Sequence, residues 1–130
     1  MYKDFKKWHS QKEYIHYQPI ESGLYFKEGD IWWARLGANV GFEQDGKGES
    51  FSRPVLIIKK FNQHVFWAIP LSSKIKDNPY YMECKSMDGR VRSAIISQIK
   101  LVSVKRLTDK MSHVESRYLE EIKKAIKGLL

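Results

Sequence analysis

The spacing of hydrophobic residues near the N-terminus predicts an amphipathic helix over residues 3–16. Phe5, Trp8 and Ile15 recur at helical spacing, which brings them to one face. Pro19 then ends the helical pattern.

The middle of the chain carries short apolar runs rich in β-branched and aromatic residues, which predict antiparallel strands. The run at 30–36 is largely apolar on both faces, so we expect a strand that is either central in the sheet or covered on both sides. Residues 61–63 are expected to turn one hairpin, and Asp88-Gly89 is a strong signal for a second. The predicted strands span residues 30–36, 54–60, 64–70, 80–85, 90–97 and 98–104.

A second helix is predicted at the C-terminus. Ser112 and Glu115 have the spacing of a capping box that starts a helix. The residues that follow alternate between an apolar face and a charged face, which is typical of a helix docked on a core. The apolar face comprises Val114, Tyr118, Leu119, Ile122, Ala125, Ile126 and Leu129.

These elements together predict an α+β, mainly β fold, with a small antiparallel barrel or curled sheet between two helices. Residues 37–52 contain four glycines and no periodicity, so they are expected to form a long loop. A loop of this length in a small domain is usually functional or disordered.

Charge adds a class of partner to this picture. The 130 residues include 23 Lys and Arg and 15 Asp and Glu, giving a formal net charge of +8. Such a balance favours a polyanionic partner, with nucleic acid first and a membrane surface second. No basic amphipathic helix stands apart from the core pattern, so we expect no membrane partner.

Composition also excludes several kinds of site. A single cysteine, Cys84, excludes an internal disulfide and a multi-cysteine zinc site, and the four histidines lack metal-ligand spacing. The N-terminus does not resemble a signal peptide, and no apolar run approaches the roughly 18 residues of a membrane span. We therefore expect a cytoplasmic protein without a metal or other cofactor.

One set of polar residues is expected to meet at the edge of the sheet. A hairpin centred on Asn62 would place Arg53 opposite position 71 and therefore beside Ser72. A guanidinium fork and a hydroxyl suit a phosphate. Two alternatives stay open: Arg53 forms a surface ion pair with Glu43, and Ser72 is a residue that merely ends a strand.

Aromatic residues on the strands have two interpretations as well. Trp32, Trp33, Phe66 and Trp67 either stack on RNA bases or pack in the core. Strand spacing favours the core.

Five ordered blocks resemble the MazF/PemK family, the toxins of type II toxin–antitoxin systems. They cover most of residues 26–130, and their order and spacing carry the resemblance rather than any single block. The blocks are GDIWWARLG (29–37), GFEQDGKG (41–48), RPVLIIKK (53–60), FWAIPLSSK (66–74) and SAIISQIKLVSVKRL (93–107).

The resemblance implies an SH3-like barrel domain over residues 26–130, preceded by a helical extension over residues 1–25. It also implies a metal-independent endoribonuclease that cleaves single-stranded RNA, often mRNA. In this family the RNA's own 2′-hydroxyl attacks the adjacent phosphate and leaves a 2′,3′-cyclic phosphate. A homodimer and a cognate antitoxin that blocks the RNA groove are implied as well.

Individual roles follow from the matching positions. The resemblance implies that Arg53 neutralises charge on the phosphorane and that Ser72 hydrogen-bonds the scissile phosphate or the leaving oxygen. Glu43 is the implied base or the partner that orients Arg53, with a purely loop-shaping role as the alternative. RNA contacts are predicted for Gln44, Lys47, Ser73, Lys74 and Gln98.

The chain also departs from the family pattern. Phe42 stands where some members have a histidine, and Ile95 and Ser97 stand where some have an acid–base pair of arginine and aspartate. These departures keep open a decayed toxin that binds RNA or protein without cutting. An inhibitor of DNA gyrase is a further alternative, because a related toxin family shares the implied fold.

Overall fold

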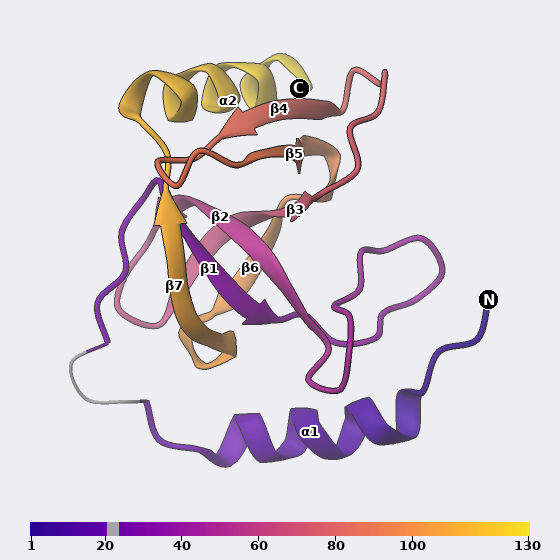
Figure 1. The fold of residues 1–130 in the computed structure, drawn as a ribbon. Helices are drawn as coiled ribbons and strands as arrows, with labels where there is room; N and C mark the ends of the chain where they lie inside the picture. The colour runs from indigo at the N-terminus through magenta and orange to yellow at the C-terminus, as the bar shows by residue number, and fades with distance from the viewer. Residues whose placement is uncertain (21–23) are drawn as a thin grey trace.

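Two helices lie at opposite ends of a curled antiparallel sheet in the computed structural model, which describes residues 1–20 and 24–130 (Figure 1). Residues 21–23, part of the predicted extension, lie outside the described residues. The predicted α+β, mainly β class is confirmed. The elements are α1 (Phe5–Tyr17), β1 (Asp30–Arg35), β2 (Ser52–Lys60), β3 (Val65–Ser72), β4 (Tyr81–Lys85), β5 (Val91–Ile95), η1 (Ile96–Gln98), β6 (Lys100–Ser103), η2 (Val104–Arg106), β7 (Leu107–His113) and α2 (Ser116–Gly128).

The sheet curls far enough for its two edge strands to meet. Among the described residues its strands follow the order β4-β5-β3-β2-β1-β7, and β6 pairs with β3. Ser86, just after β4, forms an isolated bridge with Val114, just after β7. The Met87 amide donates to the His113 carbonyl oxygen at 2.9 Å. The result is the predicted small SH3-like barrel, with a seam that is not fully closed.

Strand β1 separates two hydrophobic cores, as expected for a strand that is apolar on both faces. Trp32 and Ala34 face a cluster inside the barrel that includes Phe66. Ile31 faces a second cluster, which α2 covers with Leu119 and other apolar residues. The core interpretation therefore holds for Trp32 and Phe66, whereas Trp33 and Trp67 are 39% and 45% exposed.

Helix α1 packs on the long loop that connects β1 to β2. The Asp4 side chain caps the helix by accepting from the Lys7 amide, which satisfies one of its free N–H groups. Trp8 and Ile15 form a small cluster with Ala38, and Phe51 packs against it. The apolar face predicted for this helix therefore packs on the β1–β2 loop rather than on the barrel interior.

The C-terminal part of the chain differs from the prediction. Ser112 does not cap a helix: it lies in β7, paired with Ile31. Helix α2 begins at Ser116, and Glu115 is its N-cap without a side-chain hydrogen bond. The strand escaped prediction because β7 is an edge strand with only one buried residue, and its sequence lacks the apolar alternation of a half-buried strand.

The predicted strand 98–104 is also shorter than expected. Its first residue closes the 3₁₀ turn η1, and its last begins η2, so only residues 100–103 pair with β3. No helix within the described residues is long and apolar enough to cross a membrane.

The hairpin of β2 and β3 has a different register from the one predicted. Near its turn Lys60 pairs with Phe66, and beyond a bulge Val55 pairs with Pro70. Asn62 accepts from the amides of His64 and Val65, so the connection is one residue longer than expected. Continued two residues beyond the pair of Val55 and Pro70, this register places Arg53 across from position 72 rather than 71.

Replacing Gly37 tests how tightly α1 is seated on the loop. A Cβ there would lie 2.0 Å from Trp8 Cε2, and Gly37 has a φ of +86°; at Gly48 the φ is +73° and the space is open. We expect Gly48→Ala to cost about 1–2 kcal/mol, from the left-handed backbone. Gly37→Ala is expected to cost roughly 1–3 kcal/mol more, because Trp8 must move. Urea unfolding measures both, and equal losses would contradict the packing described.

Candidate functional site

A pocket of about 630 Å³ lies where the β1–β2 loop meets the ends of β3, β5 and β7. Most of its polar groups are cations or hydroxyls, and the single carboxylate among its lining residues is Asp109. The cations are Lys47, Arg53, Arg90 and Arg92, and the hydroxyls are Ser50, Ser52, Ser72, Ser73 and Thr108. Such a lining suits an anion that presents several oxygen acceptors.

Arg53 lies at the centre of this arrangement and is 7% exposed. Its Nε donates to the Asp45 carbonyl oxygen at 2.8 Å, and its Nη1 donates to the Leu71 carbonyl oxygen at 3.1 Å. With the Gln44 amide turned so that its oxygen faces the guanidinium, that oxygen accepts from Nη2 at 2.8 Å. These contacts use three of the five N–H groups of the fork and leave two for a ligand.

The charge of Arg53 survives its burial. Burial lowers the pKa of the guanidinium, and interactions with Tyr81 and Asp45 act in the opposite direction. An arginine side chain remains protonated in proteins, so the pocket keeps a fixed positive charge. The surface ion pair with Glu43, the alternative interpretation of Arg53, is absent from the described contacts; the Glu43 carboxylate accepts from the Val40 amide instead.

Ser72 lies beside Arg53, as the hairpin argument requires. It ends β3, directly after the Leu71 carbonyl that Arg53 contacts, and both residues line the pocket. Its hydroxyl accepts from the Lys74 amide at 3.2 Å, which leaves its own proton free to donate. Ser73 also lines the pocket.

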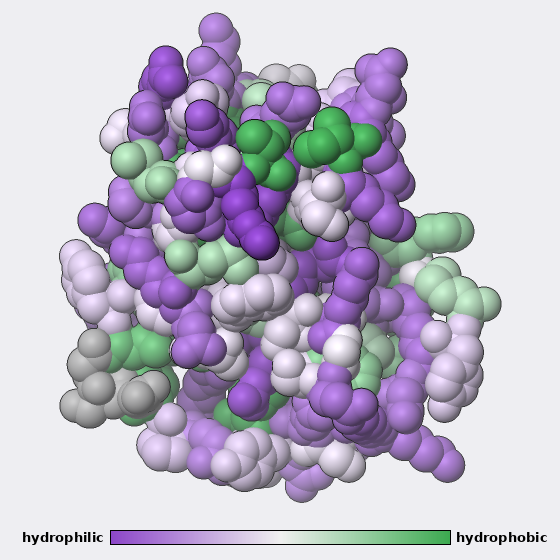
Figure 2. All heavy atoms as spheres, in the orientation of Figure 1, coloured by the Kyte–Doolittle hydropathy of each residue, from purple (hydrophilic) through white to green (hydrophobic). Residues whose placement is uncertain are grey.

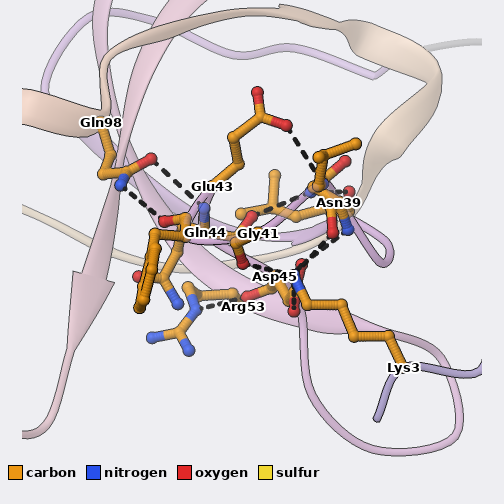
Figure 3. Close-up of polar contacts among 11 residues, drawn as sticks. Lys3, Asn39, Gly41, Glu43, Gln44, Asp45, Arg53 and Gln98 are labelled. Atoms are coloured by element: carbon orange, nitrogen blue, oxygen red, sulfur yellow. Dashed lines mark hydrogen bonds and ion pairs between the residues drawn. The ribbon is translucent and has the colours of Figure 1, made fainter. Parts of the chain in front are cut away.

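The remaining predicted site residues fall into two groups. Lys47 lines the pocket, whereas Lys74 is exposed and outside its lining. Glu43 and Gln98 are not among the lining residues, and the Glu43 side chain points away from Arg53 (Figure 3). Gln98 holds the loop in place, since its oxygen accepts from the Gln44 amide at 3.2 Å and its Nε2 donates to the Phe42 carbonyl oxygen at 3.1 Å.

Two arginines of the pocket were missed in the sequence. Arg90 and Arg92 follow the Asp88-Gly89 turn two residues apart, Arg90 directly before β5 and Arg92 within it, and both line the pocket. Arg92 is buried and donates to the Ser86 hydroxyl at 2.8 Å. Hydrogen bonds from Ser86 and from the Arg90 amide lower the pKa of Asp88, which keeps a negative charge beside Arg92. The alternation of basic residues after the turn is the sequence signal that could have identified Arg90 and Arg92.

The other missed residues come from β1 and β7. Trp33 lines the pocket from β1, and Thr108, Asp109 and Met111 line it from β7. The β7 residues could not be placed because the strand itself was not predicted. No group of three or more His, Cys, Asp or Glu side chains in residues 1–20 and 24–130 is arranged to hold a metal ion.

One face of the molecule is largely hydrophilic. Figure 2 shows one face of the molecule on which hydrophilic side chains predominate and hydrophobic ones are scattered, some of them gathered near the end of the view where α2 lies. The net charge of the chain, +8, favours attraction of polyanions at long range.

Comparison with known proteins identifies a family and one similar sequence. The family described as PemK-like, MazF-like toxin of type II toxin-antitoxin system matches residues 27–130. Endoribonuclease EndoA of Bacillus subtilis (strain 168) is 28% identical over 109 residues, which cover 77% of this chain and 90% of that protein.

Solved structures share the fold at lower identity. MazF from Deinococcus radiodurans, in crystal form I, has a TM-score of 0.68 at 17% identity, covering 82% of this chain and 96% of that one. A mycobacterial endoribonuclease in complex with its cognate antitoxin has a TM-score of 0.59 at 15% identity, covering 80% of this chain and 93% of that one.

Replacing Arg53 tests its structural part separately from its chemistry. Arg53→Ala leaves the Asp45 and Leu71 carbonyl oxygens without their donor, and we expect the free energy of unfolding to fall by about 1–3 kcal/mol. Arg90→Ala removes the same charge from the exposed rim of the pocket, and the expected change stays within about 0.5 kcal/mol. Urea unfolding of both variants measures the difference, and equal stability would contradict the bonding described for Arg53.

Proposed function

Because this chain belongs to the PemK-like, MazF-like toxins of type II toxin–antitoxin systems, we propose that it is an endoribonuclease that cleaves single-stranded RNA without a metal ion. The family match covers residues 27–130, and the similarity to EndoA supports the activity. The observation that carries the proposal for the site is the pocket in which buried Arg53 and the Ser72 hydroxyl lie together.

The proposed reaction is a transfer within the RNA, and its atoms balance without a metal ion or a second substrate. The 2′-oxygen of the RNA attacks the adjacent phosphorus, and the bond from phosphorus to the 5′-oxygen breaks. The products are a 2′,3′-cyclic phosphate and a 5′-hydroxyl, and the proton lost by the 2′-hydroxyl is balanced by the one gained by the 5′-oxygen. Negative charge builds on the non-bridging oxygens in the transition state, where fixed cationic donors act most strongly.

Arg53 supplies such a donor. Its contacts with Asp45 and Leu71 fix the guanidinium before RNA arrives, so little reorganisation is required during the reaction. The two remaining N–H groups are directed to the phosphate in this proposal. The Ser72 hydroxyl donates a hydrogen bond to the same phosphate or to the leaving 5′-oxygen.

The surrounding residues bind the RNA strand. Lys47, Arg90 and Arg92 bring further positive charge to the pocket, and Ser73 adds a hydroxyl. Lys74 contacts the RNA beyond the pocket. Contacts of this kind to the phosphate backbone provide affinity that does not depend on sequence.

In this proposal Glu43, Gln44 and Gln98 keep the β1–β2 loop in its conformation and do not take part in the chemistry. Gln44 holds Arg53 with its side chain, and Gln98 holds the loop at Phe42 and Gln44. Glu43 takes the loop-shaping role, since its carboxylate binds the Val40 amide.

A cognate antitoxin is a partner of this chain, as the family implies. Structures titled as complexes of MazE with MazF from Deinococcus radiodurans have the same fold, with TM-scores of 0.62 and 0.60. We propose that single-stranded RNA and a second copy of the chain are the other partners, and that the protein acts in the cytoplasm.

One specific observation favours a second candidate, an RNA-binding protein that does not cut. The pocket is lined by one carboxylate, Asp109, and by no histidine. Phe42, which stands where some family members have a histidine, is 92% exposed at the loop surface. Binding of RNA without cleavage would establish this candidate instead.

Mapping of RNA ends distinguishes the two candidates. Purified protein incubated with a long, mixed-sequence, single-stranded RNA in excess EDTA is expected to give discrete cuts with cyclic-phosphate and 5′-hydroxyl ends. The same sequence made with 2′-O-methyl nucleotides is expected to stay intact, because its nucleophile is blocked. Cutting of the methylated RNA would rule out attack by the 2′-oxygen, and an intact unmodified RNA would leave the binding candidate.

Replacing Ser72 tests the second group of the site. Ser72→Ala removes a hydrogen bond that the proposal places in the transition state, so kcat is expected to fall by roughly 10²-fold or more. Ser10→Ala removes a hydroxyl from exposed α1 and serves as the matched control, with no change expected. Single-turnover cleavage rates measure both, and a Ser72→Ala rate equal to that of the control would remove Ser72 from the mechanism.

A further inference from the structure

The loop that holds Arg53 is itself held from the N-terminus of the chain. Arg53 depends on this loop for two contacts, the Asp45 carbonyl oxygen and the Gln44 amide oxygen. The position of the guanidinium therefore depends on the order of residues 44 and 45. Figure 3 shows Lys3 on the opposite side of the same loop segment from Arg53.

Lys3 inserts its ammonium group into this loop. The side chain is 8% exposed, although it lies three residues from the start of the chain. Its Nζ donates to the carbonyl oxygens of Asn39 and Gly41 at 2.6 and 2.9 Å, and to Asp45 Oδ1 at 3.2 Å. All three protons of the ammonium group are used, so Lys3 is fully bonded within the protein.

Asp45 connects Lys3 to Arg53. Its carboxylate lies 3.0 Å from Lys3 Nζ and accepts from the Asn39 amide at 2.7 Å. Its carbonyl oxygen accepts from Arg53 Nε. Asp45 thus links the side-chain ammonium of Lys3 to the guanidinium of Arg53. Disorder at Lys3 would therefore loosen the contact that holds Arg53.

Helix α1 begins two residues after Lys3, and its side chains contact the second half of the same loop. Lys7 forms an ion pair with Glu49, and Gln11 Nε2 donates to the Glu49 carbonyl oxygen at 2.7 Å. The Trp8 ring packs against Phe51 with the ring centroids 5.5 Å apart. Phe51 has a φ of +50°, a left-handed conformation that a side chain other than glycine adopts only when its surroundings hold it.

We propose that Lys3 is a positioning residue for RNA cleavage, and that the N-terminal segment preorders the loop that carries Gln44 and Asp45. The inference rests on the proposed function, and it goes beyond the family because the match begins at residue 27. Preorganised donors accelerate a reaction only while they are held in the productive geometry. Lys3 acts through Asp45, without touching the RNA.

Lys3→Met keeps the length of the side chain and removes its charge and its donors. Lys6→Met is the matched control, since Lys6 lies three residues further along in the first turn of α1, loses the same charge and is exposed. We expect Lys3→Met to lower kcat roughly 10- to 100-fold with little change in KM. Lys6→Met is expected to cleave at the wild-type rate, and equal kcat values for the two variants would overturn the proposal.

Hydrogen exchange gives a readout that does not need RNA. The amides of residues 39–46 are expected to exchange about tenfold faster or more in Lys3→Met than in Lys6→Met, while the amides of β2 and β3 keep their protection. Unchanged exchange in residues 39–46 would refute the role of Lys3 whether or not the wild-type protein cuts RNA. If the wild type does not cut RNA, the proposed function fails, and the exchange result still decides the role of Lys3 in the loop.

A double-mutant cycle tests the route through Arg53. In an Arg53→Lys background the loop no longer holds a guanidinium, so Lys3→Met is expected to lower the cleavage rate less than it does in the wild type. Equal fold losses in the two backgrounds would show that Lys3 acts elsewhere. Lys3→Arg, which restores the charge and several donors, is expected to recover part of the rate.

Discussion

The burial of one guanidinium organises this end of the molecule. Arg53 projects from β2 into a place where water has little access, and three protein oxygens replace the water that the charge gives up. Those oxygens come from the β1–β2 loop and from the end of β3, so a single side chain ties together segments that are far apart in the sequence. A buried charge that lost these partners would cost several kcal/mol, on the order of the net stability of a small domain.

Contacts at the base of the β1–β2 loop add to those of Arg53 and explain why this long loop is ordered. Gly37 at its start donates to the carbonyl oxygen of Phe51 at its end, at 3.1 Å, so the loop is closed at its base. Gly46 packs so closely on Phe51 that a Cβ would lie 1.6 Å from the Phe51 carbonyl oxygen. A structureless connection of this length would be mobile, whereas this one is a fixed part of the site. Its order is what allows the pocket to hold its donors in place before RNA binds.

Much of the fold could be predicted because short stretches of the sequence carry clear signals for individual strands, turns and helices. Both faces of β1 are apolar, the Asp88-Gly89 turn marks a hairpin, and the apolar face of α2 repeats at helical spacing. Strand β7 could not be predicted, because an exposed edge strand has no apolar alternation. The predicted helix start at Ser112 was wrong because Ser112 pairs with Ile31 of β1, and this pairing outweighs the local preference for a helix start.

The site was predictable only where it depends on hairpin geometry. Arg53 and Ser72 lie on neighbouring strands of one hairpin, so register arguments bring them together even with an error of one residue. Arg92 reaches the pocket through the curl of the sheet, and Lys3 contacts the loop residue Asp45 from 42 residues earlier in the sequence. Contacts of that range leave no periodic signal in the sequence, because they are set by tertiary packing.

The central claim is that a guanidinium held at position 53 stabilises the charge that develops on the phosphate. Chemical rescue tests it most directly: the cleavage rate of Arg53→Ala is measured while guanidinium ions are added at concentrations below those that unfold the variant. The account predicts a weak basal rate that rises with guanidinium and does not rise with ammonium at equal ionic strength. A variant that cuts RNA at the wild-type rate without any added ion would contradict it.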